Sequence, residues 1–335
     1  GGPMRSVAVV GAGSWGTALA VHLARVGHAV RLWGRDEALV ADMTARQANA
    51  VYLPDVRFPD ALEVTASLPE ALGGAELVVI AVPSHGLRHV LRQGAAHVAP
   101  SAIVLSATKG LEDGSLLRMT EVIAQEWPGV GEVAVLSGPS FAKELACSQP
   151  TVVVVASRSD IAVRHVQDEF RSGALRLYGS SDVVGVELGG ALKNVIAIAA
   201  GVVEGLGLGH NAKAALITRG LAEISRLAVA AGGERDTLSG LAGMGDLVLT
   251  CTGDLSRNRQ VGLALASGRT VRDIVASTKM VAEGIRTTHA ALALGRALDV
   301  ELPIAAQVER LLQGHATPKE AVSELMGRRQ RAEAE

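Results

Sequence analysis

One lysine stands in the middle of an apolar stretch of the chain. Residues 187–201 read ELGGALKNVIAIAAG, in which leucine, valine and isoleucine flank Lys193. Burying an ammonium group is costly unless another group pairs with it, and two interpretations follow. In one, the lysine stem lies along an apolar surface while the ammonium reaches water. In the other, the ammonium is a catalytic amine in a substrate cleft.

Small residues surround this lysine along the same predicted helix. Gly189 and Gly190 precede Lys193 by four and three positions, and Ala197 follows it by four. Residues at these spacings are neighbours on a helix surface. The missing side chains allow either another backbone or a ligand to come close, and the sequence leaves both open.

A second set of glycines has the spacing of a dinucleotide-binding turn. The run VAVVGAGSWGTALA contains Gly11-x-Gly13-x-x-Gly16 directly after a predicted strand and at the start of a predicted helix. In this context the three glycines permit the tight turn, the approach of a pyrophosphate and close packing of helix on strand. The amides of Ser14 and Trp15 would then face the anion at the positive end of the helix.

The end of the next predicted strand bears on the choice of cofactor. The stretch RLWGRDE places Arg35 and then Asp36 about where a ribose-binding group is expected. Arg35 can pair with a 2′-phosphate, so we expect NADPH to be accepted, while Asp36 keeps NADH open. A solvated arginine at a strand end is the alternative. Tyr52 could stack near the adenine or be an ordinary core or surface tyrosine.

Polar groups follow three further predicted strands, in PSHG, SATKG and LSGPSFAKE. Ligands in open α/β sheets lie beyond the carboxyl ends of the strands. We therefore expect Lys109 to project over the crevice, with Gly138 and Ser140 offering backbone groups and a hydroxyl nearby. His85 is a candidate general acid, although a structural or peripheral role is the favoured interpretation.

A glycine-rich segment in the second half carries the remaining polar candidates. Asp246 lies in AGMGDLVLTCTGDLSRN, which we expect to be a loop that bends back toward the lysine helix. Asp254 or Ser256 is the predicted N-cap of the helix that follows. That helix start, with Ser256, Arg257 and Asn258, is a suitable cradle for a phosphate monoester. The alternative is an ordinary capped helix with solvated charges.

The elements that must position these groups follow from the hydrophobic pattern. In the first half, short apolar runs alternate with amphipathic stretches, which predicts a Rossmann-type, doubly wound parallel sheet covered on both faces. From residue 183 onward the pattern is helical. We therefore expect a dinucleotide-binding domain over residues 1–180 and a helical substrate domain over residues 181–335. The opening GGP, residues 1–3, is interpreted as a remnant of recombinant expression.

Composition narrows the class of protein. Of 335 residues, 48% are hydrophobic and only 2% aromatic, and the formal net charge is −2, so we expect no binding to nucleic acid or anionic membranes through bulk charge. Two cysteines, without metal-ligand spacing, indicate no metal site and a reducing cytoplasm. Glycines within residues 4–24 argue against a signal peptide, and no uncharged run is long enough to span a membrane.

The chain resembles a known family of enzymes. The motifs GAGSWGTALA, NAVYLP, ATKGLE, SGPSFAKE, ELGGALKNVIAIAAG, LAGMGDLVLTCTGDLSRNRQVG and VAEGIRT occur in this order, as in bacterial NAD(P)-dependent glycerol-3-phosphate dehydrogenase. The likeness runs from about Arg5 to Leu325. It implies reversible reduction of dihydroxyacetone phosphate to sn-glycerol 3-phosphate, for phospholipid synthesis.

The resemblance also implies a role for individual residues. The family's proton donor and acceptor falls on Lys193. Its substrate contacts fall on Lys109, Gly138, Ser140, Asp246, Ser256, Arg257 and Asn258. Its cofactor contacts fall on Ser14, Trp15, Arg35, Tyr52, Lys109, Ala142, Arg257, Val281 and Glu283. The chain departs from the family at Gly34, where relatives often carry a second basic or imidazole side chain, so the preference for NADPH over NADH stays open.

The proposed chemistry sets a requirement on the environment of Lys193. A free lysine is a poor base at neutral pH because its pKa is near 10.4. We expect burial and the like charge of Lys109 to lower the pKa of Lys193, and Asp246 to oppose this shift and hold the amine in place.

Two other functions fit parts of the pattern. A 3-hydroxyacid or 6-phosphogluconate-type dehydrogenase also joins a Rossmann domain to a lysine-bearing helix. A non-catalytic redox sensor would bind the dinucleotide, but it has no evident need for Lys109, Lys193 and Asp246 together. The alanine- and glycine-rich helices permit a homodimer without requiring one, and the charged tail from residue 328 has no assigned role.

Overall fold

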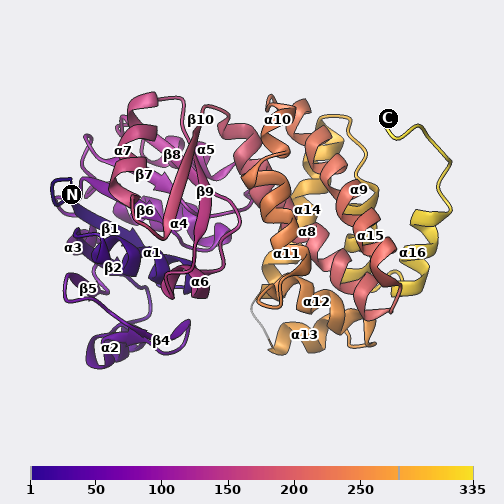
Figure 1. The fold of residues 1–335 in the computed structure, drawn as a ribbon, viewed down its shortest axis with the longest axis horizontal. Coiled ribbons are helices and arrows are strands. Elements are labelled where there is room, and N and C mark those ends of the chain that lie inside the picture. The colour runs from indigo at the N-terminus through magenta and orange to yellow at the C-terminus, as the bar shows by residue number, and fades with distance from the viewer. Residues whose placement is uncertain (1, 278–279, 335) are drawn as a thin grey trace.

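An eight-stranded sheet forms the centre of the N-terminal half (Figure 1). The computed structural model describes residues 2–277 and 280–334, and for residues 280–282 it describes the backbone alone. The strand order is β10-β9-β8-β7-β6-β1-β2-β5. The bounds are β1 Ser6–Val10, β2 Ala29–Trp33, β5 Leu62–Thr65, β6 Leu77–Ile80, β7 Ile103–Ser106, β8 Glu132–Ser137, β9 Thr151–Ala156 and β10 Leu175–Ser180. A separate small sheet pairs β3 (Ala48–Asn49) with β4 (Leu53–Arg57).

Alternate residues of each central strand point to opposite faces of the sheet, and helices cover both faces. Val7 and Val9 of β1 pack in one apolar cluster with α1 (Ser14–Arg25) and α7 (Asp160–Phe170). Ala8 and Val10 pack in another, with the helices of the opposite face. Those helices are α3 (Leu68–Leu72), α4 (Leu87–Gly94) and α5 (Met119–Glu126). Burial on both faces explains why these strands read as continuous apolar runs.

The sheet departs from an all-parallel one at a single pair of strands. β8 and β9 run antiparallel, with Val135 opposite Ala156, whereas the other pairs of this sheet are parallel. The chain between them, residues 138–150, holds only the short helix α6 (Ala142–Ala146), and parallel neighbours need a longer crossover. The predicted Rossmann-type fold is confirmed, and its sheet is parallel at every pair except β8 and β9.

The C-terminal half is built around one long apolar helix, α8 (Val183–Gly205). Its apolar side chains pack with those of the surrounding helices in one cluster. The other helices are α9 Gly209–Ala230, α10 Arg235–Leu238, α11 Asp246–Thr252, α12 Arg257–Ala266, α13 Val271–Ser277, α14 Met280–Ala297, α15 Pro303–Leu312 and α16 Pro318–Met326. Among the described helices α8 alone is long and apolar enough to cross a membrane, but 83% of that window is buried inside the protein, as in a core helix.

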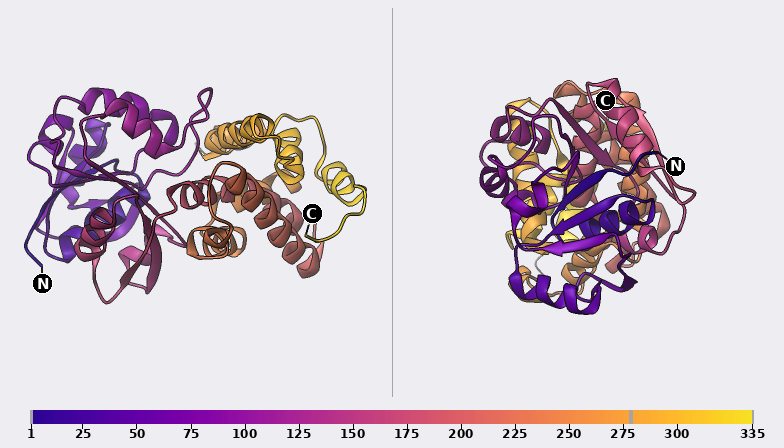
Figure 2. Two further views of the ribbon diagram at one scale, coloured as in Figure 1. Left: turned by 90° about the horizontal axis from the view of Figure 1, so that it is seen from above. Right: turned by 90° about the vertical axis from the view of Figure 1, so that its left-hand side faces the viewer.

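The two halves lie end to end and meet at the start of α8 (Figures 1 and 2). The last strand ends at Ser180 and α8 begins at Val183. The division into domains at residues 180 and 181 stays a prediction, although the change from strand to helix falls there. The carboxyl ends of β7 and β8 are followed by Lys109 and Gly138, which reach the helical half through contacts described below.

Candidate active site

The glycine turn leaves an open space at the start of α1. Gly11 has φ +122°, and a Cβ there would lie 2.5 Å from the carbonyl oxygen of Ala81, so only glycine fits. A Cβ at Gly16 would lie 2.0 Å from the oxygen of Gly11, whereas one at Gly13 would meet no described atom within 4 Å. Gly13 caps α1 without a side-chain hydrogen bond. The first-turn amides are therefore available to an anion, and the turn fits the pyrophosphate of a dinucleotide.

A buried asparagine that sequence reasoning missed holds this turn in shape. Asn49 donates from Nδ2 to the oxygen of Ala12 and to Oγ1 of Thr17, both at 3.0 Å. Its Oδ1 accepts from the amide of Tyr52 at 3.1 Å. The oxygen of Tyr52 in turn accepts from Oγ of Ser14 at 2.7 Å. Two expected cofactor contacts, Ser14 and Tyr52, are thus brought together through Asn49, whose position in NAVYLP is the one local signal of its role.

The start of α12 reaches the same turn from the helical half. Nη2 of Arg257 donates to Oγ of Ser14 at 3.3 Å, across 243 positions of sequence. Ser256 is the N-cap of α12, because its Oγ accepts from the amide of Arg259 at 3.2 Å. Of the two predicted caps, Asp254 is the wrong one, and its side chain is 97% exposed. The predicted phosphate cradle therefore lies beside the predicted dinucleotide turn.

Arg35 and Asp36, the two candidates for ribose recognition after β2, have different surroundings. Arg35 is exposed, as a partner for a 2′-phosphate needs to be. Asp36 caps α2 (Glu37–Arg46), with Oδ1 accepting from the amides of Ala38 and Leu39. A Cβ at Gly34 would lie 3.1 Å from Val40 and 3.3 Å from Ala12, so this position is tightly packed.

Two lysines share one buried carboxylate between the halves. Nζ of Lys193, on α8, lies 2.5 Å from Oδ1 of Asp246, and Nζ of Lys109 lies 2.9 Å from Oδ2. Lys109 also donates to the oxygen of Gly138 at 3.4 Å. The Asp246 side chain is fully buried, and that of Lys193 is 11% exposed. The interpretation of Lys193 as a lysine whose head simply reaches water is therefore wrong.

The glycines beside Lys193 explain how this cluster forms. A Cβ at Gly189 would lie 2.6 Å from the oxygen of Ala242, so the backbone before Asp246 packs directly on α8. The predicted glycine-rich loop is in fact a π-helical turn, Leu241–Gly245, followed by α11, whose first residue is Asp246. It does approach the lysine helix, as expected. Close packing of another backbone is thus the reason for Gly189.

Burial is the largest influence on the pKa of Lys193. Burial lowers that pKa, Asp246 raises it and the charge of Lys109 lowers it, and together they bring it from its ordinary value to about 7. The three directions are those expected from the sequence. An amine with a pKa near 7 can hold or release a proton at neutral pH, which suits a general acid and base.

The structure places the other predicted site residues after β8, on α6 and at the starts of α12 and α14. Oγ of Ser140 donates to the oxygen of Gly138 at 2.9 Å, and Ala142 begins α6. Asn258 is buried, on the first turn of α12. Glu283, on α14, accepts from the amide and hydroxyl of Ser84 at 3.0 and 2.8 Å. The side chain of Val281 is outside the described part of the chain.

His85 lies at the edge of this region. Its Nδ1 is 3.7 Å from Oε1 of Glu283, and its side chain is 48% exposed. It follows Pro83 in the short turn after β6. Its exposure and its distance from Glu283 are consistent with a peripheral role, which the sequence analysis also favoured.

A second buried carboxylate, also missed, ties the lysine helix to the sheet half. Glu187 lies on α8, six residues before Lys193. It accepts from Nη1 of Arg118 at 2.8 Å, from the amide of Thr120 at 3.1 Å and from the Thr120 hydroxyl. Burial raises the pKa of Glu187, while Arg118 acts in the opposite sense. The signal in the sequence was a glutamate in the apolar first half of the helix.

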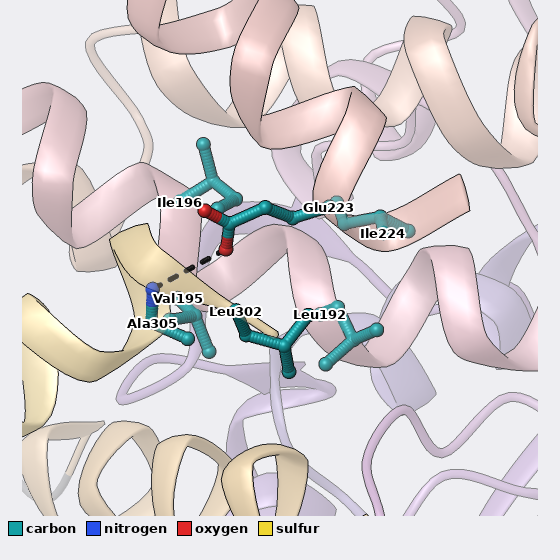
Figure 3. Close-up of a pocket in the computed structure, with 7 residues that line it drawn as sticks. All are labelled: Leu192, Val195, Ile196, Glu223, Ile224, Leu302 and Ala305. Carbon is teal, nitrogen blue, oxygen red and sulfur yellow. Dashed lines mark hydrogen bonds between the residues drawn. The ribbon is translucent and has the colours of Figure 1, made fainter. Parts of the chain in front are cut away.

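A small cavity in the helical half does not belong to this site. Figure 3 shows the residues that line it, among them Glu223. Its volume is about 10 Å³, which is room for about one water molecule. The Glu223 carboxylate accepts from the amides of Ile304 and Ala305 at the start of α15, and burial raises its pKa to about 7. Lys193 does not line this cavity. Within residues 2–277 and 280–334, no cluster of three or more histidine, cysteine or acidic side chains could hold a metal ion.

The glycine turn and the lysine–aspartate cluster together define the class of protein. A Rossmann sheet with an open anion turn, joined to a helical half that supplies Lys193 and Arg257, is the architecture of a two-domain nicotinamide-dependent dehydrogenase. Family models of NAD-dependent glycerol-3-phosphate dehydrogenase match residues 6–162 with their N-terminal part and residues 182–323 with their C-terminal part. The chain belongs to this family.

Individual relatives agree over nearly the whole chain. A glycerol-3-phosphate dehydrogenase [NAD(P)+] of Acidobacterium capsulatum is 53% identical over 333 residues, 97% of this chain and 98% of the relative. That of Koribacter versatilis is 51% identical over 329 residues, with the same coverage. The crystal structure of glycerol-3-phosphate dehydrogenase from Coxiella burnetii superposes with a TM-score of 0.93 at 42% identity, covering 97% of this chain and 99% of that one. The resemblance stated from the motifs is confirmed.

Proposed function

We propose that this protein catalyses the reversible, NAD(P)H-dependent reduction of dihydroxyacetone phosphate to sn-glycerol 3-phosphate. The observation that carries the proposal is the contact of Lys193 and Lys109 with one buried carboxylate, Asp246, between the two halves. Names of relatives that are about half identical over the full chain support the same reaction. The neighbouring start of α12 supplies groups for a phosphate.

In this proposal the chain positions the substrate and moves a proton. A nicotinamide dinucleotide bound along the glycine turn would supply the hydride. Lys193 gives its proton to the carbonyl oxygen during reduction and removes the hydroxyl proton during oxidation. Lys109 adds a second positive charge beside the oxygen as negative charge develops on it. Asp246 holds both ammonium groups in place.

The phosphate of the substrate is held at the N-terminus of α12. Arg257 pairs with it by charge-assisted hydrogen bonds, and Ser256 and Asn258 bind it from the same turn. Gly138 and Ser140, after β8, complete the substrate contacts. The proposed cofactor contacts are Gly11, Gly13, Ser14, Trp15, Gly16, Arg35, Tyr52, Lys109, Ala142, Arg257, Val281 and Glu283.

We further propose that the enzyme works in the cytoplasm and supplies glycerol 3-phosphate for glycerophospholipid synthesis. Two free cysteines, one of them buried, support a reducing compartment. The burial of α8 inside the helical half favours a protein that does not insert into membranes. A homodimer stays a prediction, which sedimentation would test.

The direct experiment is an assay of the purified chain with NADPH and dihydroxyacetone phosphate, followed by nicotinamide absorbance. We expect turnover with this substrate, and much weaker turnover with 2- or 3-hydroxy carboxylates in the oxidising direction. Activity on a hydroxy carboxylate alone would favour the 3-hydroxyacid or 6-phosphogluconate-type alternative. Binding of NADPH without turnover on any of these would favour the sensor.

A further inference from the structure

Ser137, the last residue of β8, carries a hydroxyl that has no hydrogen-bond partner among the described residues. The residue is 3% exposed. Its Oγ is the one buried side-chain nitrogen or oxygen without a hydrogen-bond partner that the structure records among its described residues. An unpaired buried hydroxyl lowers the stability of the folded protein. Its presence at Ser137 therefore points to a role other than stabilising the fold.

The position of Ser137 suggests that reason. A Cβ at Gly190 of α8 would lie 2.7 Å from Oγ of Ser137 and 3.5 Å from Cδ of Lys109. The hydroxyl and the lysine stem therefore lie against the same point of α8. Gly138, which follows Ser137, already accepts from Nζ of Lys109. The absence of a side chain at Gly190 makes room for both groups.

The ammonium of Lys109 has a third N–H group that can donate a hydrogen bond to the Ser137 hydroxyl. An ammonium can donate three hydrogen bonds, and the structure records two from Lys109, to Asp246 and to Gly138. Its stem is flexible, with donors that can rotate. Ser137 is therefore an acceptor beside a lysine that the proposed reaction uses.

Another buried serine at a strand end shows the ordinary arrangement. Ser157 directly follows β9, and its Oγ donates to the oxygen of Val133 at 2.8 Å and accepts from the amide of Ser159 at 3.2 Å. Val133 is near the amino end of β8, whereas Ser137 is at its carboxyl end. Ser157 and Ser137 therefore lie at opposite ends of the strand pair β8–β9. The two serines thus differ in pairing and in distance from the lysine cluster.

We propose that Ser137 is a positioning residue whose hydroxyl accepts a hydrogen bond from the Lys109 ammonium while substrate occupies the site. This rests on the proposed function, in which Lys109 stabilises charge on the substrate oxygen. Ser137 then holds Lys109 toward the substrate instead of leaving it bound to Asp246 and Gly138 alone. Movement of the Lys109 ammonium to this hydroxyl during turnover would give the hydroxyl the partner that it lacks in the structure.

The test compares Ser137→Ala with the matched control Ser157→Ala. We expect Ser137→Ala to lower kcat with dihydroxyacetone phosphate about tenfold, the loss of one hydrogen bond to a charged group. Its melting temperature should equal or exceed that of the wild type, and its dissociation constant for NADPH should be unchanged. Ser157→Ala should show the reverse, a lower melting temperature with kcat unchanged, because its hydroxyl is paired.

A double-mutant cycle with Lys109→Met tests whether Ser137 acts through Lys109. Adding Ser137→Ala to Lys109→Met should cause no further loss of kcat, because the donor has already been removed. If the double variant instead loses kcat by the product of the two single-variant factors, the proposal is overturned. A wild-type kcat in Ser137→Ala would also overturn it, as would a fall in melting temperature like that of Ser157→Ala. The wild-type assay separates these results from failure of the proposed function, since an inactive wild type would remove the function itself.

Discussion

The Nζ atom of Lys193 lies 2.5 Å from Oδ1 of Asp246, although 53 residues separate them in sequence. The aspartate also binds Lys109, so one negative charge holds two positive charges in a buried place. This arrangement keeps an amine of lowered pKa in a fixed position at the junction of the two halves.

The pH dependence of the two reaction directions should be opposite. Oxidation needs the neutral amine of Lys193, whose fraction rises as pH passes the pKa of about 7. The kcat/KM for oxidation should therefore rise through neutral pH, and that for reduction should fall. The substrate phosphate also titrates, near pH 6, but a change of its charge would act on both directions in the same sense. Because reduction consumes a proton overall, the ratio of the two kcat/KM values must change with pH for any mechanism. The test of Lys193 is therefore a bend in each profile near pH 7. Profiles without a bend near neutral pH would contradict its role.

Asp246→Asn should remove the charge that holds both lysines. Without it the pKa of Lys193 should fall further, because Asp246 is the group that raises it. We expect kcat for reduction to drop about a hundredfold or more, the range in which a positioned general acid acts. Asp254→Asn is the matched control, since that aspartate is exposed, and its kcat should be that of the wild type. Equal kinetics of the two variants would show that Asp246 has no such role.

Arg257→Ala should separate phosphate binding from the rest of catalysis. The KM for dihydroxyacetone phosphate should rise about 10- to 100-fold, because a charge-assisted hydrogen bond is lost. The KM for unphosphorylated dihydroxyacetone should change little. Steady-state kinetics with both substrates measure this, and an equal effect on both would refute the phosphate assignment.

Arg35→Ala tests recognition of the cofactor. Arg35 is exposed at the end of β2, while Asp36 is engaged as the cap of α2. The variant should bind NADPH about tenfold more weakly, with NADH binding unchanged, because only NADPH carries the 2′-phosphate. Titration of nicotinamide fluorescence gives both constants. If the variant binds NADPH and NADH more weakly by the same factor, Arg35 supports the fold and does not recognise the 2′-phosphate.

Local chemistry explains what the sequence could predict. The three glycines of the turn, the cap at Ser256 and the apolar inner strands each follow from rules that act over a few residues. The apolar pattern does not predict the edge strands β5 and β10, because both include exposed residues and lack a continuous apolar run. The antiparallel direction of β9 does not follow from its apolar run, because the short chain between β8 and β9 decides how the two strands pair.

Long-range contacts explain what the sequence could not predict. Asn49 shapes the glycine turn from 32 and 37 positions away. Glu187 binds Arg118 and Thr120 across a junction that no local pattern records. The motifs named Lys193 and Asp246 as site residues, but only the packing of the turn before α11 on Gly189 brings them into contact.

The most direct measurement is the turnover of Lys193→Ala with NADPH and dihydroxyacetone phosphate, with the dissociation constant for NADPH determined on the same preparation. NADPH binding should be nearly unchanged and kcat should fall by about three orders of magnitude, because the amine that exchanges the proton is gone. A kcat close to that of the wild type would contradict the role of Lys193 in proton transfer.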